Sequence, residues 1–192
     1  MMLAPTGIYR RFVASTRAVA AIEFAAIVPV LLVLFLTSFD AGNGIAAYMK
    51  VRAATYTLAA ITNQYTTIST TDMTSVTGAT ATVLAPYTGT TVVVLTQIKA
   101  TSAAAASVSW SYSPTSGQAL TQGNPVTNLP TNFAQNTCNN TYPCYIIWAQ
   151  VSYTFVPTFT YFMSNSLTFS DSLYATPRSS ECIQYNGTPS SC

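Results

Sequence analysis

An uninterrupted apolar segment near the N-terminus constrains this chain more than any other feature. The segment runs from Ala18 to Phe39, and Glu23 is its only ionisable residue. About 20 apolar residues in a helix suffice to cross the ~30 Å hydrocarbon core of a bilayer. Arginines gather before the segment, which favours a cytoplasmic N-terminus. The sequence therefore predicts a cytoplasmic basic segment over residues 1–17, a transmembrane helix over residues 18–39 and an exported domain over residues 40–192.

A cleaved secretory signal is the alternative explanation of the same segment. Such a signal has a shorter apolar region that ends in a small-x-small cleavage site. The core from Ile27 to Phe39 is followed by Asp40-Ala41-Gly42, where such a site would fit. Retention of the helix and cleavage after it both remain open on this evidence.

The balance of polar and charged residues narrows the function classes. Only 6% of the residues are charged, the net charge is +2, and Ser, Thr, Asn and Gln are plentiful after residue 60. This uncharged polar surface suits an exported domain, and the absence of a basic cluster argues against nucleic-acid binding.

Catalysis has few candidate groups in this chain. There is no histidine to serve as a base, and a Ser–Lys pair would have to use Lys50 or Lys99. Asp171 and Glu181 are the candidate carboxylate pair, and nothing in the sequence places them in a pocket. We therefore expect no enzymatic activity, no cofactor, no metal site and no small-molecule substrate.

Periodicity predicts two helices beyond the membrane segment. The first continues over residues 45–65, with one packing stripe at 3–4 spacing, and the glycines of Gly42-Asn43-Gly44 predict a loosening of the helix just before it. The second begins near Thr70 or Thr71 and ends at Pro86. The stripe of the first helix consists of Tyr48, Val51, Thr55, Leu58, Thr62 and Tyr65.

The rest of the chain has the pattern of strands. TVVVLTQIKA is β-branched, SVSWSYS alternates Val108, Trp110 and Tyr112 with serines, and YIIWAQVSYTFVP is the longest apolar alternation. One-sided alternation is typical of an antiparallel sheet with one buried face. The predicted fold class is α+β: a long N-terminal helix, half transmembrane and half amphipathic, and a second helix packed on a sheet of three or four strands.

The cysteines indicate an oxidising compartment. Four cysteines allow three pairings. The local pairs Cys138–Cys144 and Cys182–Cys192 are the preferred prediction, because each closes a loop that contains turn-forming residues. Their spacing does not match a zinc site, and disulfides persist in exported proteins but rarely in the cytosol.

The segment VAAIEFAAIVPVLL resembles the N-terminal signature of the TadE/TadG-like proteins of the tight-adherence (Flp) pilus system. Family members have a small residue, four small or apolar residues, Glu-Phe, and a proline six residues after the glutamate. This chain supplies Ala18, Glu23-Phe24 and Pro29. Cleavage in the family usually follows Gly, where this chain has Ala18. Later landmarks also resemble the family, in the order VLAPYTGTTVVVLTQI, SVSWSYS, GNPVTNLP, VSYTFVP and TPRSS.

The resemblance implies a pilin-like fold and a role as a minor pilin or pilus-assembly subunit. It implies cleavage between Ala18 and Val19 by a prepilin peptidase, and location in the bacterial inner membrane with a periplasmic C-terminal domain or within an extracellular pilus. The implied partners are the inner membrane and other pilus or pilin-like proteins. The alternative is a permanently anchored periplasmic binding module with no pilus role.

The implied cleavage gives Glu23 a possible partner. The new α-amino group at Val19 would lie about one helical turn from Glu23, and the glutamate of one subunit would pair with the amine of a neighbour. The simpler interpretation is a carboxylate that extends to the membrane interface. Pro29 removes one helix hydrogen bond and predicts a kink, which membrane helices tolerate.

Overall fold

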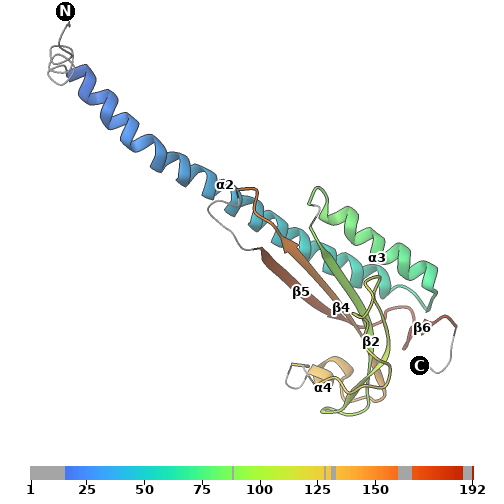
Figure 1. Cartoon of the computed structure of the whole chain (residues 1–192). Coiled ribbons are helices and arrows are strands. Elements are labelled where there is room, and N and C mark those ends of the chain that lie inside the picture. The colour runs from blue at the N-terminus through green and yellow to red at the C-terminus, as the bar shows by residue number, and fades with distance from the viewer. Residues whose placement is uncertain (1–15, 88, 128, 131–132, 160–165, 188–191) are drawn as a thin grey trace, which may run out of the picture.

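One long helix organises the whole molecule. The computed structural model describes residues 16–87, 89–127, 129–130, 133–159, 166–187 and 192. Helix α2 (Thr16–Thr62) is 47 residues long, and its first half extends away from the rest of the chain (Figure 1). Its second half lies against a sheet, beside helix α3 (Thr70–Leu84). The α+β prediction, with a long first helix, a second helix and a small antiparallel sheet, is confirmed.

The main sheet has four antiparallel strands in the order β3-β2-β4-β5. A two-stranded parallel pair, β1 with β6, lies where α2 passes into α3. A short helix, α4, precedes β4. The bounds are β1 (Thr67–Ile68), β2 (Thr91–Ala100), β3 (Ala106–Tyr112), α4 (Phe133–Cys138), β4 (Cys144–Phe155), β5 (Leu167–Ala175) and β6 (Gln184–Tyr185).

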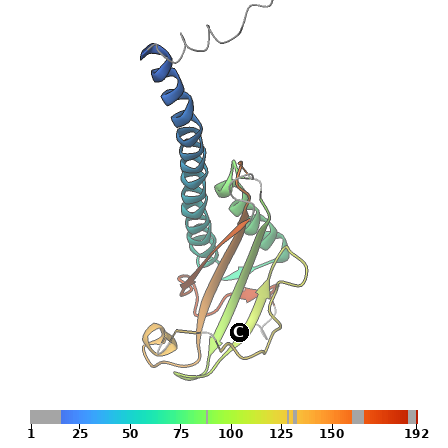
Figure 2. The ribbon, with the colours of Figure 1, turned by 60° about the vertical axis from the view of Figure 1, so that its left-hand side comes forward.

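The main core lies between the two helices and one face of the sheet. Strand β4 shows how the alternation builds it, because Val151, Tyr153 and Phe155 are buried and the intervening residues are partly exposed. Val51 and Leu58 of α2 pack against them and are fully buried. A smaller cluster covers the opposite face at the end of the sheet nearest α4, and Figure 2 shows α4 lying there.

Two local predictions need correction. Helix α2 continues without a break through Gly42-Asn43-Gly44, and packing of α2 against β4 and β5, with Phe155 and Phe169 beside Gly44, holds this region in place. Helix α3 is capped by Ser69 and not by Thr70 or Thr71. The Ser69 hydroxyl accepts from the Asp72 backbone N–H and the Asp72 carboxylate accepts from the Ser69 N–H, which together form a capping box.

The alternation in β3 is interrupted by a bulge. Gln97 pairs with Trp110, whereas Ile98 pairs with Val108, so Ser109 is an extra residue in β3. Cross-strand partners share a face of a sheet. Val108 and Trp110 therefore lie on opposite faces, and Trp110 joins the core beneath the helices. The prediction that Val108, Trp110 and Tyr112 share one face was wrong for Val108.

Candidate functional site

The exposed first half of α2, residues Val19–Phe39, is the most unusual surface of the molecule, and we call it the stem. Its large apolar side chains are exposed, with Phe24 and Phe35 each at 69%. In the described part of the chain, one helix is long and apolar enough to cross a membrane, and its most apolar window has no buried residues. At 1.5 Å per residue the 21 residues of the stem span about 32 Å, so the stem is a candidate membrane anchor.

The predicted cleavage motif lies at the start of α2. Ala18 and Val19 fall within the helix, four residues or fewer after its first residue, and the side chain of Ala18 lies outside the described residues. Glu23 and Phe24 are both exposed on the stem. Pro29 is included in the helix without ending it. In the single chain the Glu23 side chain is therefore accessible to groups of other molecules.

Asp40 joins the stem to the remainder of the described chain, which we call the head. Its carboxylate is 3% exposed and accepts hydrogen bonds from the backbone N–H groups of Thr158 and Phe159, at 3.1 and 3.0 Å. The Phe159 ring also contacts Phe39 edge-on, with centroids 6.1 Å apart. Sequence reasoning treated Asp40 only as a charge that follows the membrane segment. An acid at the end of a long apolar helix was the available signal.

A groove of about 380 Å³ lies where α2 enters the head, and we call it the junction groove. Its aromatic wall is built by Phe169, whose ring lies 6.0 Å from those of Tyr48 and Phe155. Asp40 is the only acidic or basic residue among the described residues that line it. The lining residues are Asp40, Ala41, Gly44, Ile45, Tyr48, Phe155, Leu167 and Phe169.

The neighbouring corner of the head is held by Lys50 and Gly89. Lys50 lies off the α2 packing stripe, and its Nζ donates to the carbonyls of Val83 and Ala85 at the end of α3, where a cation is favourable. A Cβ on Gly89 would come within 2.2 Å of the Thr154 carbonyl, so only glycine fits there. These contacts fix the end of α3 and the start of β2 against α2.

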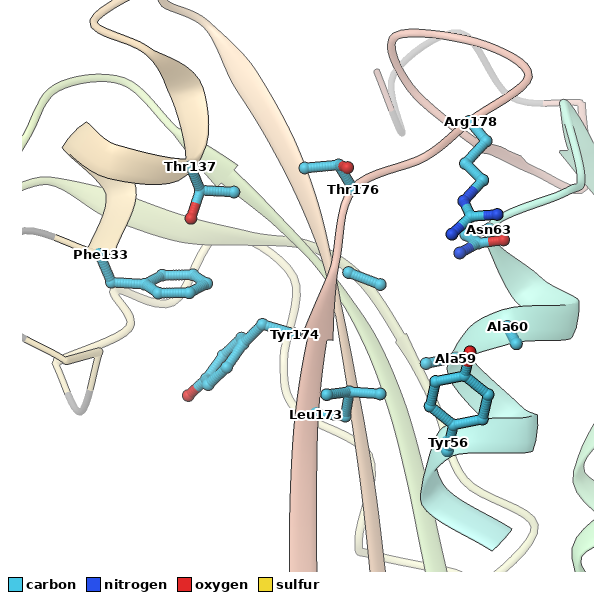
Figure 3. A pocket seen from close by; sticks show the side chains of 11 residues that line it. Tyr56, Ala59, Ala60, Asn63, Phe133, Thr137, Leu173, Tyr174, Thr176 and Arg178 are labelled. Carbon is cyan, nitrogen blue, oxygen red and sulfur yellow. The ribbon is translucent and has the colours of Figure 1, made fainter. Parts of the chain in front are cut away.

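A second cleft, of about 390 Å³, lies between the end of α2 and strand β5 (Figure 3). The Asn63 and Arg178 side chains lie beside each other on one wall (Figure 3), and the backbone N–H of Arg178 donates to the backbone carbonyl of Asn63 at 2.8 Å. Tyr174 stacks on Trp148 at 5.5 Å on the other side, and burial raises the pKa of the Tyr174 phenol. The lining residues include no carboxylate, amine or imidazole to serve as a general base.

The structure contains both of the preferred disulfides. Cys138–Cys144 connects α4 to β4, and Cys182–Cys192 closes the C-terminal segment, with Cα atoms 5.7 and 5.8 Å apart respectively. No cysteine is free among the described residues.

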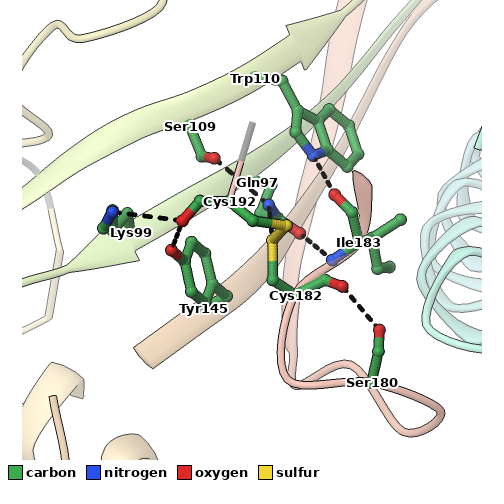
Figure 4. The surroundings of a disulfide bond; sticks show 9 residues. All are labelled: Gln97, Lys99, Ser109, Trp110, Tyr145, Ser180, Cys182, Ile183 and Cys192. Carbon is green, nitrogen blue, oxygen red and sulfur yellow. Dashed lines mark hydrogen bonds between the residues drawn. A yellow bond between two sulfur atoms is a disulfide. The ribbon is translucent and has the colours of Figure 1, made fainter. Parts of the chain in front are cut away.

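Figure 4 shows how the C-terminal segment is held against the sheet. The buried Gln97 side chain accepts from the Ile183 N–H at 2.9 Å, and Trp110 donates its indole N–H to the Ile183 carbonyl at 2.8 Å. Lys99 and Tyr145 both donate to the Cys192 carbonyl. Together these hydrogen bonds hold the C-terminal segment against the sheet, and we call them the C-terminal clamp. No pattern in the sequence singled out Gln97.

The candidate carboxylate pair is divided between two elements. Asp171 lies on β5, and Glu181 lies in the C-terminal segment beside Cys182, where it lines a pocket together with both disulfides. No group of three or more metal-ligating side chains is present among the described residues.

Comparison with known protein families gives a match over the helix that carries the stem. No curated protein and no solved structure gives a match to the chain. Residues 18–60 match the model of a family described as TadE-like protein. The matched region includes the whole stem, the junction with the head and nearly all of α2, so the first helix is similar to the TadE-like family, in agreement with the resemblance seen in the sequence.

Proposed function

We propose that this chain is a membrane-anchored minor pilin or pilus-assembly subunit of a tight-adherence system. The observation that carries the proposal is the stem: an exposed apolar helix that coincides with the TadE-like region and continues directly into a folded head. Such a helix has two kinds of favourable neighbour, lipid tails and other apolar helices. In a subunit of this kind the stem contacts lipid tails in the bacterial inner membrane before assembly and contacts other apolar helices after assembly.

In this proposal the head lies on the periplasmic side and acts by binding, without catalysis. The basic residues before the stem and the disulfides of the head support this orientation. The partners are other pilus or pilin-like proteins, which contact the stem.

Processing is the first part of the proposal to test. We propose that a prepilin peptidase cleaves between Ala18 and Val19, which leaves Val19–Thr62 as a continuous 44-residue helix. The intact mass of the membrane-extracted protein reports the mature N-terminus directly. A mature chain that begins at Val19 supports the proposal. A chain that begins at Met1 or Met2, or beyond Asp40, contradicts the cleavage.

Glu23 tests assembly separately from membrane insertion. Glu23→Ala removes a charge from an exposed position on the stem, so insertion and folding of the head should be unchanged. In an assembly it would leave the Val19 amine of a neighbour without its partner, at a cost of about 3–5 kcal/mol. We expect normal membrane levels and loss of co-purification with pilus proteins.

Ile22→Ala is the matched control, because Ile22 is the adjacent residue and is 60% exposed. This variant removes apolar area and leaves the charge. If Glu23→Ala and Ile22→Ala co-purify with pilus proteins equally well, Glu23 is only an interface carboxylate and the proposed pairing is wrong.

A further inference from the structure

Apolar side chains gather at the end of the head that is nearest the stem. Val156 at the end of β4 is 59% exposed, Ile45 on α2 is 63% exposed, and Leu167 at the start of β5 is 41% exposed. Ile45 and Leu167 both line the junction groove. We call this end, residues 155–159 and 167–169 with residues 41–48 of α2, the base of the head.

The continuous helix fixes the height of the base relative to the bilayer. If the stem fills the hydrocarbon core, Phe39 lies at its edge, because the stem and the core are both about 30 Å long. Ile45 then lies about 9 Å beyond Phe39 along the helix axis, and Tyr48 about 14 Å beyond it. The headgroup layer is ~5–8 Å thick on each side, so residues 40–44 of α2 lie within the layer, whereas Ile45 lies at its outer limit and Tyr48 lies above it.

Contacts with Phe39 and Asp40 place the β4 end at the same depth. The Phe159 ring touches Phe39, and the Thr158 N–H donates to Asp40. Strands β4 and β5 pair Phe155 with Leu167, which brings the start of β5 to this level as well. The base therefore cannot stand clear of the headgroups while the stem spans the core.

We propose that the base of the head is seated in the interfacial layer of the bilayer that the stem crosses, with lipid occupying the junction groove. Aromatic rings are favoured at this depth because one part of the ring is apolar and the other tolerates water. The groove has an apolar wall of Phe155, Leu167 and Phe169. The one carboxylate among its described lining residues, that of Asp40, already accepts two backbone hydrogen bonds, so it does not need a polar partner from the occupant of the groove. This inference rests on the anchor role of the stem in the proposed function.

Lipid is the favoured occupant because the groove is continuous with the lipid-facing surface of the stem. Residues 40, 41, 44, 45 and 48 line the groove from the same helix that forms the stem. A protein partner would have to displace lipid from the part of the groove that lies within the headgroup layer, where residues 40, 41 and 44 line it.

Site-directed spin labelling of the full chain tests the seat. The protein would be reconstituted at low protein-to-lipid ratio in phosphatidylethanolamine–phosphatidylglycerol vesicles (3:1), and a nitroxide attached to one introduced cysteine. The described native cysteines are paired and do not compete for the label. The labelled variants are Leu34→Cys in the stem, Val156→Cys and Leu167→Cys in the base, and Ala103→Cys in the exposed hairpin between β2 and β3.

Collision with oxygen, which concentrates in lipid, is compared with collision with a water-soluble nickel chelate. Ala103 is the matched control, because β2 carries it to the other end of the sheet, about 30 Å from the base. We expect a high oxygen-to-nickel ratio at Leu34, an aqueous ratio at Ala103 and ratios at Val156 and Leu167 that are at least threefold above that at Ala103, unchanged on dilution with lipid.

The possible outcomes distinguish the proposed position of the base in the interfacial layer (the seat) from the role of the stem as a membrane anchor. Aqueous ratios at Val156 and Leu167 together with a lipid ratio at Leu34 overturn the seat and leave the anchor intact. An aqueous ratio at Leu34 as well overturns the anchor and with it the proposed function. Shielding of the base labels from both reagents that disappears on dilution shows a protein occupant and also overturns the proposal. If Val156→Cys melts at a lower temperature than the parent, Ile45→Cys replaces it.

Discussion

At the scale of single residues, Asp40 carries the connection between the two parts of the molecule. It lies at the end of an apolar stem, yet its carboxylate is buried and both of its hydrogen bonds run to backbone groups about 118 residues later in the chain. Backbone N–H groups that are buried without a partner are costly. Asp40 therefore determines whether the β4 end stays on α2.

Replacing Asp40 should destabilise the head. Asp40→Ala removes the acceptor of the Thr158 and Phe159 N–H groups, and because both hydrogen bonds are only partly buried and water can replace the carboxylate, we expect a loss of about 1–2 kcal/mol in the free energy of unfolding. Asp40→Asn retains one acceptor oxygen and should lose about half as much. Urea unfolding in mild detergent, followed by tryptophan fluorescence, measures both. Glu181→Ala is an exposed control that should change stability by less than about 0.5 kcal/mol, and an equal loss in all three variants would contradict the role of Asp40.

The cap of α3 makes stability depend on pH. The hydroxyl of Ser69, and then its backbone N–H, donate to the Asp72 carboxylate and hold its pKa below the usual value of 3.8. Because the folded pKa is lowered, the stabilising contribution is complete above about pH 4 and is lost as the pH falls through the folded value. We expect thermal stability of the parent to fall more steeply than that of Asp72→Asn between pH 5 and pH 2.

The control for this prediction separates the hydroxyl from the carboxylate. Ser69→Ala removes the capping hydroxyl and should cost about 1 kcal/mol at pH 7. It should also make thermal stability depend less on pH in acid, because the Ser69 hydroxyl lowers the pKa of Asp72 more than the Ser69 backbone N–H does. Identical acid profiles for the parent, Ser69→Ala and Asp72→Asn would show that another group sets the dependence.

At the scale of elements, the C-terminal segment is the part that most depends on a covalent link. The Cys182–Cys192 disulfide closes a loop beside the Gln97, Trp110 and Ile183 hydrogen bonds. In the chain-entropy model a loop of this length contributes about 2–3 kcal/mol. Replacing both cysteines with serine should lower stability by that amount and increase amide hydrogen exchange at Ile183 and in β6.

The other disulfide serves as the comparison for this change. Cys138→Ser with Cys144→Ser opens the connection between α4 and β4 and leaves the C-terminal clamp in place. Hydrogen exchange at Ile183 should then match the parent. If exchange at Ile183 rises equally in both double variants, the two disulfides stabilise the head as a whole and not their own segments.

The elements that the sequence predicted are those with a complete local signal. The strand alternation over Val151, Tyr153 and Phe155 predicts their burial, and Pro86 predicts the end of α3. The bulge at Ser109 has no such signal, because a serine continues the alternation whether it faces the core or is an extra residue. Cap position failed for a related reason: Ser69, Thr70 and Thr71 all carry capping hydroxyls, and only contact with Asp72 selects one.

The parts of the candidate site differ in the same way in how well the sequence predicts them. The stem was fully predictable, because length and composition within one segment define it. The junction groove was not, since Phe155, Leu167 and Phe169 reach α2 only after β4 and β5 pair. Asp40 likewise finds its donors in a part of the chain that no local pattern connects with it.

At the scale of the whole molecule, most of the exposed large apolar side chains of the described residues lie on the stem. The main core is contained in the head, and the stem contributes no buried residue to it. A chain that begins at Asp40 should therefore fold and remain monodisperse without detergent, whereas the full chain should require detergent or lipid. Size-exclusion chromatography of both forms measures this. Aggregation of the shortened chain, with its head folded by circular dichroism, would show that the base alone exposes too much apolar surface.

The unbroken course of α2 from stem to head has a mechanical consequence. A flexible tether would extend before it transmitted a force. Here a force on the head acts directly on α2, because the second half of this helix is packed in the core of the head. Tension along that axis reaches the stem with no slack. In the proposed assembly, a displacement of the head by one subunit spacing would therefore draw the stem out of the bilayer by the same distance.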